Sequence, residues 1–546
     1  MNKIYPIREI CLGDALDQAS DRWNHQIGWV LGERHVSFAE MREQADGVAR
    51  ALLASGIRTG DVVAALMPNL AEFAFCMMAC GKIGAIIAPI NTRSKRFELE
   101  HFLKHCGARL LVRVDHFLKQ DFRAQVVDLC GEGTISDDGD VRSAHLPDLR
   151  KIVSVSPEPL PGALSWSSFM AAGAAVAPAE LAAMQAGLRW NDPVLLQYTS
   201  GTTSLPKGAL CNHRYVVNFG VNRASRLGLG EGEAALNTQP FYHIGGSCGA
   251  LPLPLSIGCR VVSPAYYDVE TVLSLIERER CVTRSGMTAM YLMEVEHPRF
   301  REYDLSSLRS GWIAGAPELT EDISRRSGLS KIVQLYGSTE GGGTSGSVDD
   351  SVELRTQSCG RAFPGVEILI VDPESDAILP PRVPGEIVVK GWLRMNEYLK
   401  QPVETAAVVR ADGSVRTGDR GYLDEGGYLF FLGRIKNMLR VGGENVSAEE
   451  VESMLLRHPK IKLAAVIGVP DPRLQEVVMA IVELKEGAEA TEREIIDFCS
   501  SRMANFRVPR FVRFTTDWPM TGSGKIQKHV LKDHFAPEDA LVAGRV

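Results

Sequence analysis

The sequence predicts an α/β protein with a large, layered body of several subdomains, followed by a small α+β domain. Short apolar runs alternate with helical patterns through most of the chain, which is typical of a largely parallel sheet covered by helices. After about Gly433 the pattern changes to two capped helices and several strands. We therefore expect a body over residues 1–433 and a second domain over 434–546, joined near Arg434–Asn437.

The body shows its layering most clearly near its start. Val62–Met67 is an apolar run that predicts a buried strand, and Ala85–Pro89 predicts the next one. Between them, Asn69 can cap a helix that carries Phe73 and Met77 on one face. This strand–helix–strand unit favours a parallel sheet.

The second domain is predicted from capping residues and a turn. Ser447–Glu450 is a capping box before a helix that ends near His458, and Thr491–Glu494 opens another helix. Between them, Lys462–Leu484 reads as two strands around a Pro-Asp-Pro turn.

The composition is that of a globular protein and argues against some partners. The 546 residues are 45% hydrophobic and 23% charged, and a net charge of −7 disfavours nucleic acid. The eleven cysteines form no C-x-x-C pair, no apolar run approaches the ~18 residues of a membrane span, and the N-terminus lacks an apolar leader. We expect a cytoplasmic protein without an integral membrane segment.

One cluster has metal-ligating residue types. His101, His105 and Cys106 lie at helical spacing, but a zinc site needs three or four converging ligands. Because no second half of such a site is apparent nearby, we expect an ordinary helix surface.

The stretch YTSGTTSLPKG, Tyr198–Gly208, has the composition of a phosphate-binding loop. Its hydroxyls can donate to phosphate oxygens, its glycines let backbone NH groups approach, and Lys207 supplies a cation. It is not a P-loop, because Pro206 stands where the second glycine of G-x-x-x-x-G-K-[ST] belongs. We interpret it as a phosphate cradle of another kind.

Three further motifs place charged side chains beside glycine turns. In YGSTE, Glu340 is a natural oxygen ligand for the magnesium that a nucleotide carries, and the GGGTSG after it predicts a flexible or closely packed segment. In Arg416–Glu452, Asp419 can accept both hydroxyls of a ribose. In Trp518–Lys528, a glycine turn presents Lys525.

Taken in order, these motifs resemble those of the adenylate-forming superfamily of acyl-CoA synthetases, luciferases and nonribosomal-peptide adenylation domains. The resemblance covers about Glu9 to Phe535 and is carried by YTSGTTSLPKG, FYHIGG, YGSTE, TGD, GRIKNMLRVGGENV and TGSGK. It implies ATP, Mg²⁺ and coenzyme A, and a C-terminal domain that is mobile about a hinge. Ser204 and Asn437 depart from the usual pattern, where glycine and an acid are common.

The resemblance also implies a role for each matching residue. The ATP-binding residues would be Thr199, Ser200, Gly201, Thr202, Thr203, Lys207, Gly315, Ala316, Pro317, Tyr336, Gly337, Ser338, Thr339, Glu340, Asp419, Arg434 and Lys525. Lys525, Glu340, Lys207 and His243 would act in catalysis, with Thr199 and Glu340 on the metal. Lys436 would be the hinge, and the thiol step would use Gly442, Gly443 and Glu444. The acyl pocket would be lined by His243, Ile244, Gly245, Gly246, Trp312, Ile313, Gly341 and Gly342.

The implied reaction makes a carboxylate reactive by adenylation. The acid attacks the α-phosphorus of ATP, pyrophosphate leaves, and a thiol then displaces AMP. Coenzyme A is the expected thiol, because the chain ends soon after Lys525 without a carrier domain. The apolar or small pocket residues favour a fatty, aryl or alicyclic acid, and no acidic residue is placed to hold an α-amino group. A luciferase-like oxidative enzyme, a non-catalytic nucleotide-binding regulator and a homodimer stay open.

Overall fold

The structure is a computed structural model of the chain. It describes residues 5–158, 161–199, 206–315, 317–435, 438–442, 444–471, 473–520 and 526–539. The residues singled out above that lie outside these ranges are Ser200, Gly201, Thr202, Thr203, Ser204, Ala316, Lys436, Asn437, Gly443 and Lys525.

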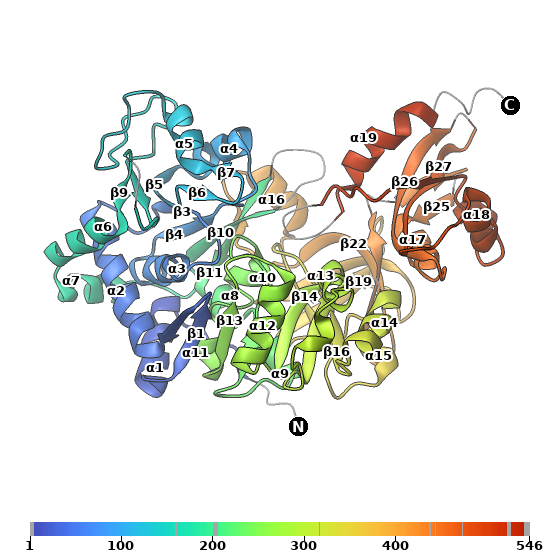
Figure 1. Ribbon diagram of the computed structural model, residues 1–546, viewed down its shortest axis with the longest axis horizontal. Helices are drawn as coiled ribbons and strands as arrows, with labels where there is room; N and C mark the ends of the chain where they lie inside the picture. The colour runs from blue at the N-terminus through green and yellow to red at the C-terminus, as the bar shows by residue number, and fades with distance from the viewer. Residues whose placement is uncertain are drawn as a thin grey trace.

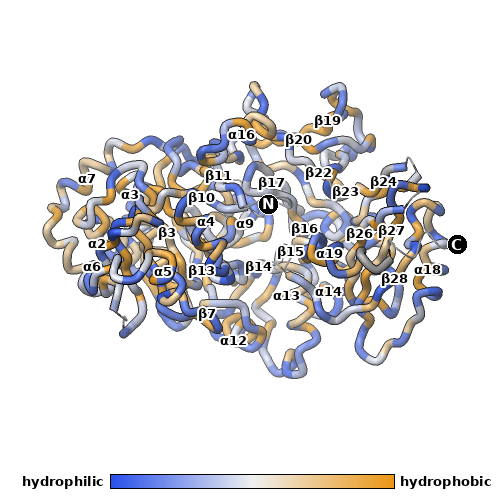
Figure 2. Tube along the Cα trace, turned by 90° about the horizontal axis from the view of Figure 1, so that it is seen from above, coloured by the Kyte–Doolittle hydropathy of each residue, from blue (hydrophilic) through white to orange (hydrophobic). Residues whose placement is uncertain are grey.

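The chain folds into a large α/β body and a smaller C-terminal α+β unit, which confirms the predicted fold class (Figure 1). In Figure 1 the C-terminal unit, coloured orange to red, lies at one end of the body. In Figure 2 hydrophobic residues run through the interiors of both units, and hydrophilic residues lie mainly at their outer loops.

Two sheets, largely parallel, form the centre of the body. Among the described residues, the larger has the order β18-β17-β16-β15-β14-β12-β13-β1-β2 and the smaller β21-β11-β10-β4-β3-β5-β8-β9. The larger comprises β1 (Ile27–Leu31), β2 (Arg34–Ser37), β12 (Ala234–Leu236), β13 (Arg260–Ser263), β14 (Thr283–Met287), β15 (Ser310–Ala314), β16 (Ile332–Gly337), β17 (Gly342–Ser345) and β18 (Arg361–Ala362). The smaller comprises β3 (Val62–Leu66), β4 (Ile86–Pro89), β5 (Ala108–Arg113), β8 (Lys151–Ser154), β9 (Leu164–Ser165), β10 (Pro193–Thr199), β11 (Lys207–Asn212) and β21 (Glu397–Tyr398).

A third, antiparallel sheet and a short hairpin complete the strands of the body. The sheet joins β19 (Val366–Val371), β20 (Gly385–Gly391), β22 (Val415–Leu423) and β23 (Leu429–Arg434), and the hairpin pairs β6 (His116–Phe117) with β7 (Gln120–Asp121). Because β22 pairs with β23 in the register Asp419 to Arg434, these two predicted site residues face each other across the ladder.

Helices cover the sheets of the body. They are α1 (Leu12–Trp23), α2 (Phe38–Ala54), α3 (Ala71–Ile83), α4 (Arg96–Cys106), α5 (Phe122–Cys130), α6 (Trp166–Ala172), η1 (Gly173–Ala175), α7 (Pro178–Ala186), α8 (His213–Asn218), α9 (Val221–Arg226), α10 (Ile244–Ser247), α11 (Pro254–Ile257), α12 (Val269–Glu279), α13 (Thr288–Val295), η2 (Phe300–Glu302), α14 (Pro317–Ser327), α15 (Val352–Gln357) and α16 (Pro402–Val408).

The C-terminal unit contains the elements that its capping residues predict. Its strands are β24 (Met438–Val441), β25 (Glu444–Ser447), β26 (Ile461–Asp471), β27 (Gln475–Leu484) and β28 (Phe511–Phe514), and its helices are α17 (Ala448–Leu456), α18 (Glu492–Ser500), η4 (Asn505–Arg507) and α19 (Lys528–Asp539). Ser447 Oγ accepts the NH of Glu450 at 3.3 Å, and Thr491 Oγ1 accepts that of Glu494 at 3.2 Å. Both predicted caps are therefore confirmed.

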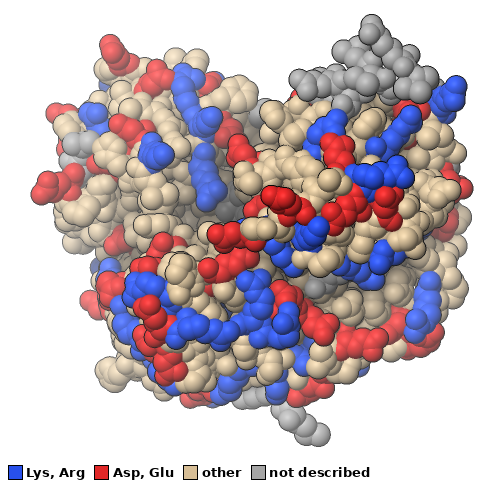
Figure 3. All heavy atoms as spheres, turned by 45° about the vertical axis from the view of Figure 1, so that its right-hand side comes forward, with Lys and Arg blue, Asp and Glu red and all other residues tan. Residues whose placement is uncertain are grey.

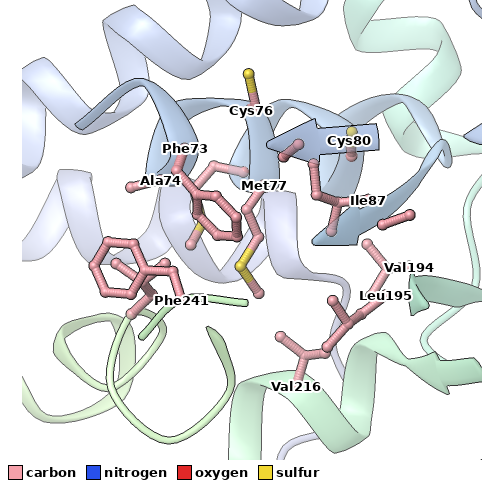
Figure 4. Close-up of a cluster of buried hydrophobic side chains, with 14 of the residues drawn as sticks. Phe73, Ala74, Cys76, Met77, Cys80, Ile87, Val194, Leu195, Val216 and Phe241 are labelled. Atoms are coloured by element: carbon pink, nitrogen blue, oxygen red, sulfur yellow. The ribbon is translucent and has the colours of Figure 1, made fainter. Parts of the chain in front are cut away.

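The hydrophobic core continues directly under the functional loops. Figure 4 shows Phe73 and Met77 of α3 pointing toward Phe241, with Val194 and Leu195 of β10 nearby. The rings of Phe73 and Phe241 lie 5.4 Å apart, and both side chains are fully buried. Because Phe241 precedes His243 by two residues, this packing fixes the start of the FYHIGG segment.

Asn69 does not cap α3 as the sequence suggested. The N-cap of α3 is Leu70, which makes no side-chain cap, and Asn69 turns instead toward the loop before His243. Its Oδ1 accepts the NH of Phe241 at 2.7 Å, and its Nδ2 donates to the carbonyl of Gln239 at 3.1 Å. Asn69 thus makes long-range hydrogen bonds instead of capping α3, and these bonds support the loop before His243.

Candidate active site

Asp419 lies at the centre of a buried polar cluster between β16 and the third sheet. Asp419 is only 4% exposed; Tyr336 Oη donates to Oδ2 at 2.8 Å, and Arg434 Nε lies 3.2 Å from Oδ1. Burial, and then the charge of Asp419, raise the pKa of Tyr336 well above its ordinary value, so the phenol keeps its proton and donates it. The cluster offers a carboxylate beside an aromatic ring, which suits a ribose and its base.

The pairing of β22 with β20 is irregular just before Asp419, and β20 holds this stretch in place. Thr417 Oγ1 donates to the carbonyl of Ile387 at 2.7 Å and accepts the NH of Asp419 at 3.1 Å. Gly418 has a φ of 68°, a left-handed conformation that favours glycine, and its NH donates to Glu386 Oε1 at 3.1 Å. The TGD sequence thus forms the irregular part of β22 that orients Asp419.

Glu340 follows β16 and lies beside Tyr398, which belongs to none of the predicted motifs. The turn is closed by Ser338, whose Oγ donates to the carbonyl of Gly341 at 2.7 Å. Tyr398 Oη donates to Glu340 Oε1 at 2.8 Å, and Lys207 Nζ lies 5.0 Å from the centre of the Tyr398 ring. Tyr398 therefore brings the carboxylate of one motif and the cation of another to a single place.

Strands β10 and β11 carry the two ends of the predicted phosphate loop. Thr199 and Lys207 are paired residues of this antiparallel ladder, so the intervening segment begins and ends at one point. Gly208 packs closely, since an added Cβ would lie 2.8 Å from Leu196 Cδ1. Residues 200–205 lie outside the described part of the chain.

His101 and His105 are not an ordinary helix surface, contrary to our expectation. His105 Nδ1 lies 3.0 Å from Tyr198 Oη, and His101 Nε2 lies 3.2 Å from the carbonyl oxygen of Pro206. Burial lowers the pKa of His105, which favours its neutral form. Within the described residues, no group of three or more His, Cys, Asp or Glu side chains is arranged to hold a metal ion.

His243 caps the short helix α10 in the FYHIGG segment. Its Nδ1 accepts the NH of Gly245 at 3.2 Å, which fixes the ring at the start of the helix. Gly246 is required for packing, because an added Cβ would lie 2.3 Å from the carbonyl oxygen of Pro240. The paired glycines therefore serve close packing at Gly246, whereas Gly245 lines the cavity described next.

A cavity of about 40 Å³ lies between α9, α10 and strands β12, β14 and β15. Of the predicted acyl-pocket residues, Gly245 and Trp312 line it. Its apolar lining also includes Ala224, Leu227, Leu229, Ala235, Leu236, Ala250, Leu253 and Val261. Two arginines, Arg223 and Arg284, line it as well, and neither belongs to a predicted motif.

The other predicted acyl-pocket residues do not line this cavity. Ile244 and Ile313 are buried in the core, and Gly341 packs against Val415, where an added Cβ would lie 3.3 Å from Val415 Cβ. At Gly342 an added Cβ would lie 2.5 Å from Gly337 Cα. The GGGTSG segment is thus closely packed, and its Gly342–Ser345 forms β17.

The predicted adenine segment leads into α14. An added Cβ at Gly315 would lie 1.8 Å from Thr288 Oγ1, so only glycine fits between β15 and α13 there. Pro317 is the first residue of α14. Ala316 lies outside the described residues.

In the C-terminal unit, Gly442 and Glu444 stand on an exposed turn. Gly442 has a φ of 60°, and its NH donates to the carbonyl of Leu474 at 2.8 Å. Lys528, three residues after Lys525, pairs with Glu452 at 2.8 Å and with Glu449 at 3.3 Å. These ion pairs fasten the start of α19 to α17.

Family models match both units. The model of the AMP-binding enzyme family matches residues 16–399, and that of the AMP-binding enzyme C-terminal domain matches residues 450–525. The chain therefore belongs to the AMP-binding enzyme family.

Individual relatives agree with this assignment along nearly the whole chain. The medium-chain acyl-CoA ligase ACSF2 of Bos taurus is 33% identical over 538 residues, which cover 96% of this chain and 87% of that protein. The anthranilate CoA ligase AuaEII in complex with anthranoyl-AMP is 27% identical, with a TM-score of 0.84 over 98% of this chain and 99% of the other. ATP-bound MatB from Rhodopseudomonas palustris is 25% identical, with a TM-score of 0.82 over 97% of this chain and 100% of the other. The protein is an acid–thiol ligase of the acyl-CoA synthetase type.

A membrane-spanning helix is not evident in the described part of the chain. No single helix there is both long and apolar enough, and only the sharply bent pair Trp166–Ala175 and Pro178–Ala186 meets the requirement by length and composition.

Proposed function

We propose that this enzyme activates a carboxylic acid with an apolar body as its acyl-adenylate and transfers the acyl group to coenzyme A at the site around Asp419 and Glu340. The observation that carries the proposal is the buried Asp419, held between Tyr336 and Arg434 at 2.8 and 3.2 Å. A buried carboxylate is suited to accept hydrogen bonds from the two hydroxyls of a ribose.

In the first step an acid oxygen attacks the α-phosphorus of ATP, the bond to the bridging oxygen breaks, and pyrophosphate leaves. Two anions meet in this step, so cations must offset the developing charge. Lys207 stands at the end of the phosphate loop, and Lys525 is proposed to reach the acid and the α-phosphate. In the second step the thiolate of coenzyme A attacks the acyl carbon and AMP leaves.

Glu340 is suited to hold the magnesium that accompanies ATP. Its carboxylate is only partly buried, and Tyr398 donates a single hydrogen bond to Oε1, so oxygen lone pairs stay available for a hard cation. Thr199, at the end of β10, is the proposed second ligand. When bound, the metal would supply positive charge to the phosphate oxygens.

The acid is proposed to be fatty, aryl or alicyclic. The cavity beside His243 is lined mainly by leucines, alanines and valine, which favour an apolar acyl group. The names of the relatives, a medium-chain acyl-CoA ligase and an anthranilate CoA ligase, include one fatty and one aryl acid. On the face seen in Figure 3, basic and acidic residues are interspersed, so selectivity is expected from this cavity rather than from a broad charged surface.

The experiment that tests the proposal is a pyrophosphate-release screen over a panel of carboxylic acids, with and without coenzyme A. We expect release of pyrophosphate with at least one acid of apolar body, and formation of its acyl-CoA when coenzyme A is present. ATP binding without pyrophosphate release from any acid would contradict the proposal.

Tyr398→Phe is expected to lower kcat for adenylate formation about 3- to 10-fold, the effect of one lost hydrogen bond, and to raise the Mg²⁺ concentration needed for half-maximal rate. The reason is that the variant side chain would keep its ring beside Lys207 but, without the hydroxyl, would no longer orient the Glu340 carboxylate. Steady-state pyrophosphate release across a Mg²⁺ titration measures both effects. Tyr266→Phe, at a 49% exposed tyrosine, is the control; an unchanged Mg²⁺ dependence in Tyr398→Phe would refute the positioning role.

We also propose that the boundary between body and C-terminal domain lies near 433/434, where β23 ends at Arg434, and that Lys436 is the hinge. Lys436→Pro is expected to slow thioester formation more than adenylate formation, because proline fixes φ and restricts the backbone rotation that reorients the domain. Single-turnover assays of each half-reaction measure this. Unchanged turnover of Lys436→Pro with coenzyme A would contradict the proposed hinge role of Lys436.

A further inference from the structure

Arg223 of α9 lines the cavity beside His243 with few partners for its guanidinium. Its Nη2 donates to the carbonyl of Gly249 at 3.0 Å, and its guanidinium carbon lies 4.9 Å from the centre of the Trp312 ring. No acidic side chain of the described residues forms an ion pair with it. A guanidinium has five N–H donors, and burial lowers the pKa of Arg223 to about 10, which reflects the cost of burying its charge.

Two neighbouring arginines have the hydrogen-bond or ion-pair partners that are typical of a buried guanidinium with a structural role. Arg226, one turn along α9, donates to the backbone carbonyls of Ser345, Arg361 and Ala362. Arg284, which also lines the cavity, forms a buried ion pair with Glu294. Among the described residues, Arg223 has neither a carboxylate nor a set of carbonyls, and it borders an open space.

The neighbourhood keeps Arg223 in place and leaves room beside it. At Gly249 an added Cβ would lie 2.7 Å from Arg223 Nη2, so a glycine there accommodates the guanidinium. The cavity of about 40 Å³ holds roughly three water-sized groups, since each needs on the order of 10–15 Å³. A carboxylate has three heavy atoms, and a guanidinium binds it through two parallel hydrogen bonds.

We propose that Arg223 determines specificity by binding a second carboxylate at the far end of the acyl substrate, so that the preferred acid is a dicarboxylic acid with an apolar spacer. The inference rests on the proposed function, because the cavity is the acyl pocket only if the predicted roles of Gly245 and Trp312, which line it, are right. The cavity takes the distal carboxylate, its apolar walls contact the end of the spacer next to that carboxylate, and the Arg223 guanidinium neutralises the distal charge. Acids that end in a methyl group leave Arg223 without an anionic partner.

The test compares α,ω-dicarboxylic acids with methyl-terminated acids of equal carbon number, and with the half methyl esters of the dicarboxylic acids. For the unmodified enzyme we expect kcat/KM for a dicarboxylic acid to exceed that for its methyl-terminated match by about 10- to 100-fold, as for a charged hydrogen bond. Arg223→Met is expected to abolish this preference, mainly through KM for the dicarboxylic acid. Arg223→Lys is expected to retain part of it, and the half ester to rank below the diacid.

Arg493→Met, at an exposed arginine of α18, is the control and should leave the preference unchanged. ATP-induced thermal stabilisation of Arg223→Met shows that the variant is folded. The inference is overturned if methyl-terminated acids are preferred, or if Arg223→Met lowers kcat/KM for every acid by the same factor, as a purely structural residue would. If no acid of either kind releases pyrophosphate, the proposed function itself falls, and the inference with it.

Discussion

Lys525→Ala is expected to lower the rate of acyl-adenylate formation by about 100- to 1,000-fold, with a much smaller effect on acyl transfer to coenzyme A. A single placed donor that stabilises charge in a transition state has an effect of this size. The acid and the α-phosphate are both anionic, and removal of the amine leaves their repulsion less compensated. Thioester formation from supplied acyl-AMP no longer has this repulsion to overcome.

The measurement is single-turnover kinetics of each half-reaction, with acyl-AMP supplied for the second. Lys532→Ala is the matched control, because Lys532 lies on α19 in the same unit and is 46% exposed. It should change both rates by less than about twofold. An equal loss of both half-reactions in Lys525→Ala would contradict the role assigned to this lysine.

Asp419→Asn is expected to lower kcat/KM for ATP about 100-fold while changing KM for the acid little. The substitution keeps the shape of the side chain, but it replaces one acceptor oxygen by a donor and removes the charge that faces Arg434 at 3.2 Å. Loss of a charged hydrogen bond to the ribose, together with an unpaired buried partner, accounts for about 3 kcal/mol.

Steady-state kinetics with ATP as the varied substrate measure the effect of Asp419→Asn. Glu425→Gln is the control, because this carboxylate lies in the turn between β22 and β23 and forms an exposed pair with Arg382. Chemical denaturation of both variants separates a loss of stability from a loss of binding. Unchanged kcat/KM for ATP in a folded Asp419→Asn variant would contradict the proposal that Asp419 binds the ribose.

Local signals were enough to predict much of the fold. Strand Val62–Met67 and the helix caps at Ser447 and Thr491 depend on neighbours in the sequence, and the structure places them within a residue or two of expectation. The family resemblance predicted one common site for Tyr336, Asp419 and Arg434. In the structure both Tyr336 and Arg434 contact Asp419.

The features that the sequence did not reveal depend on long-range contacts. Asn69 has the residue type of a helix cap, yet its partners lie about 170 positions away at Gln239 and Phe241. Tyr398 lies 58 positions from Glu340, outside every motif. Arg223 lies in the short helix α9, and no motif in the sequence marks it. Only the structure places it at a cavity, where its guanidinium has no acidic partner among the described residues.

The central claim is that this enzyme cleaves ATP between its α- and β-phosphates. The most direct measurement uses ATP labelled at the α-phosphate, incubated with enzyme, Mg²⁺, an accepted acid and coenzyme A. The account predicts that the label appears in AMP, with one pyrophosphate and one acyl-CoA formed for each AMP. Recovery of the label in ADP, with release of inorganic phosphate, would contradict it.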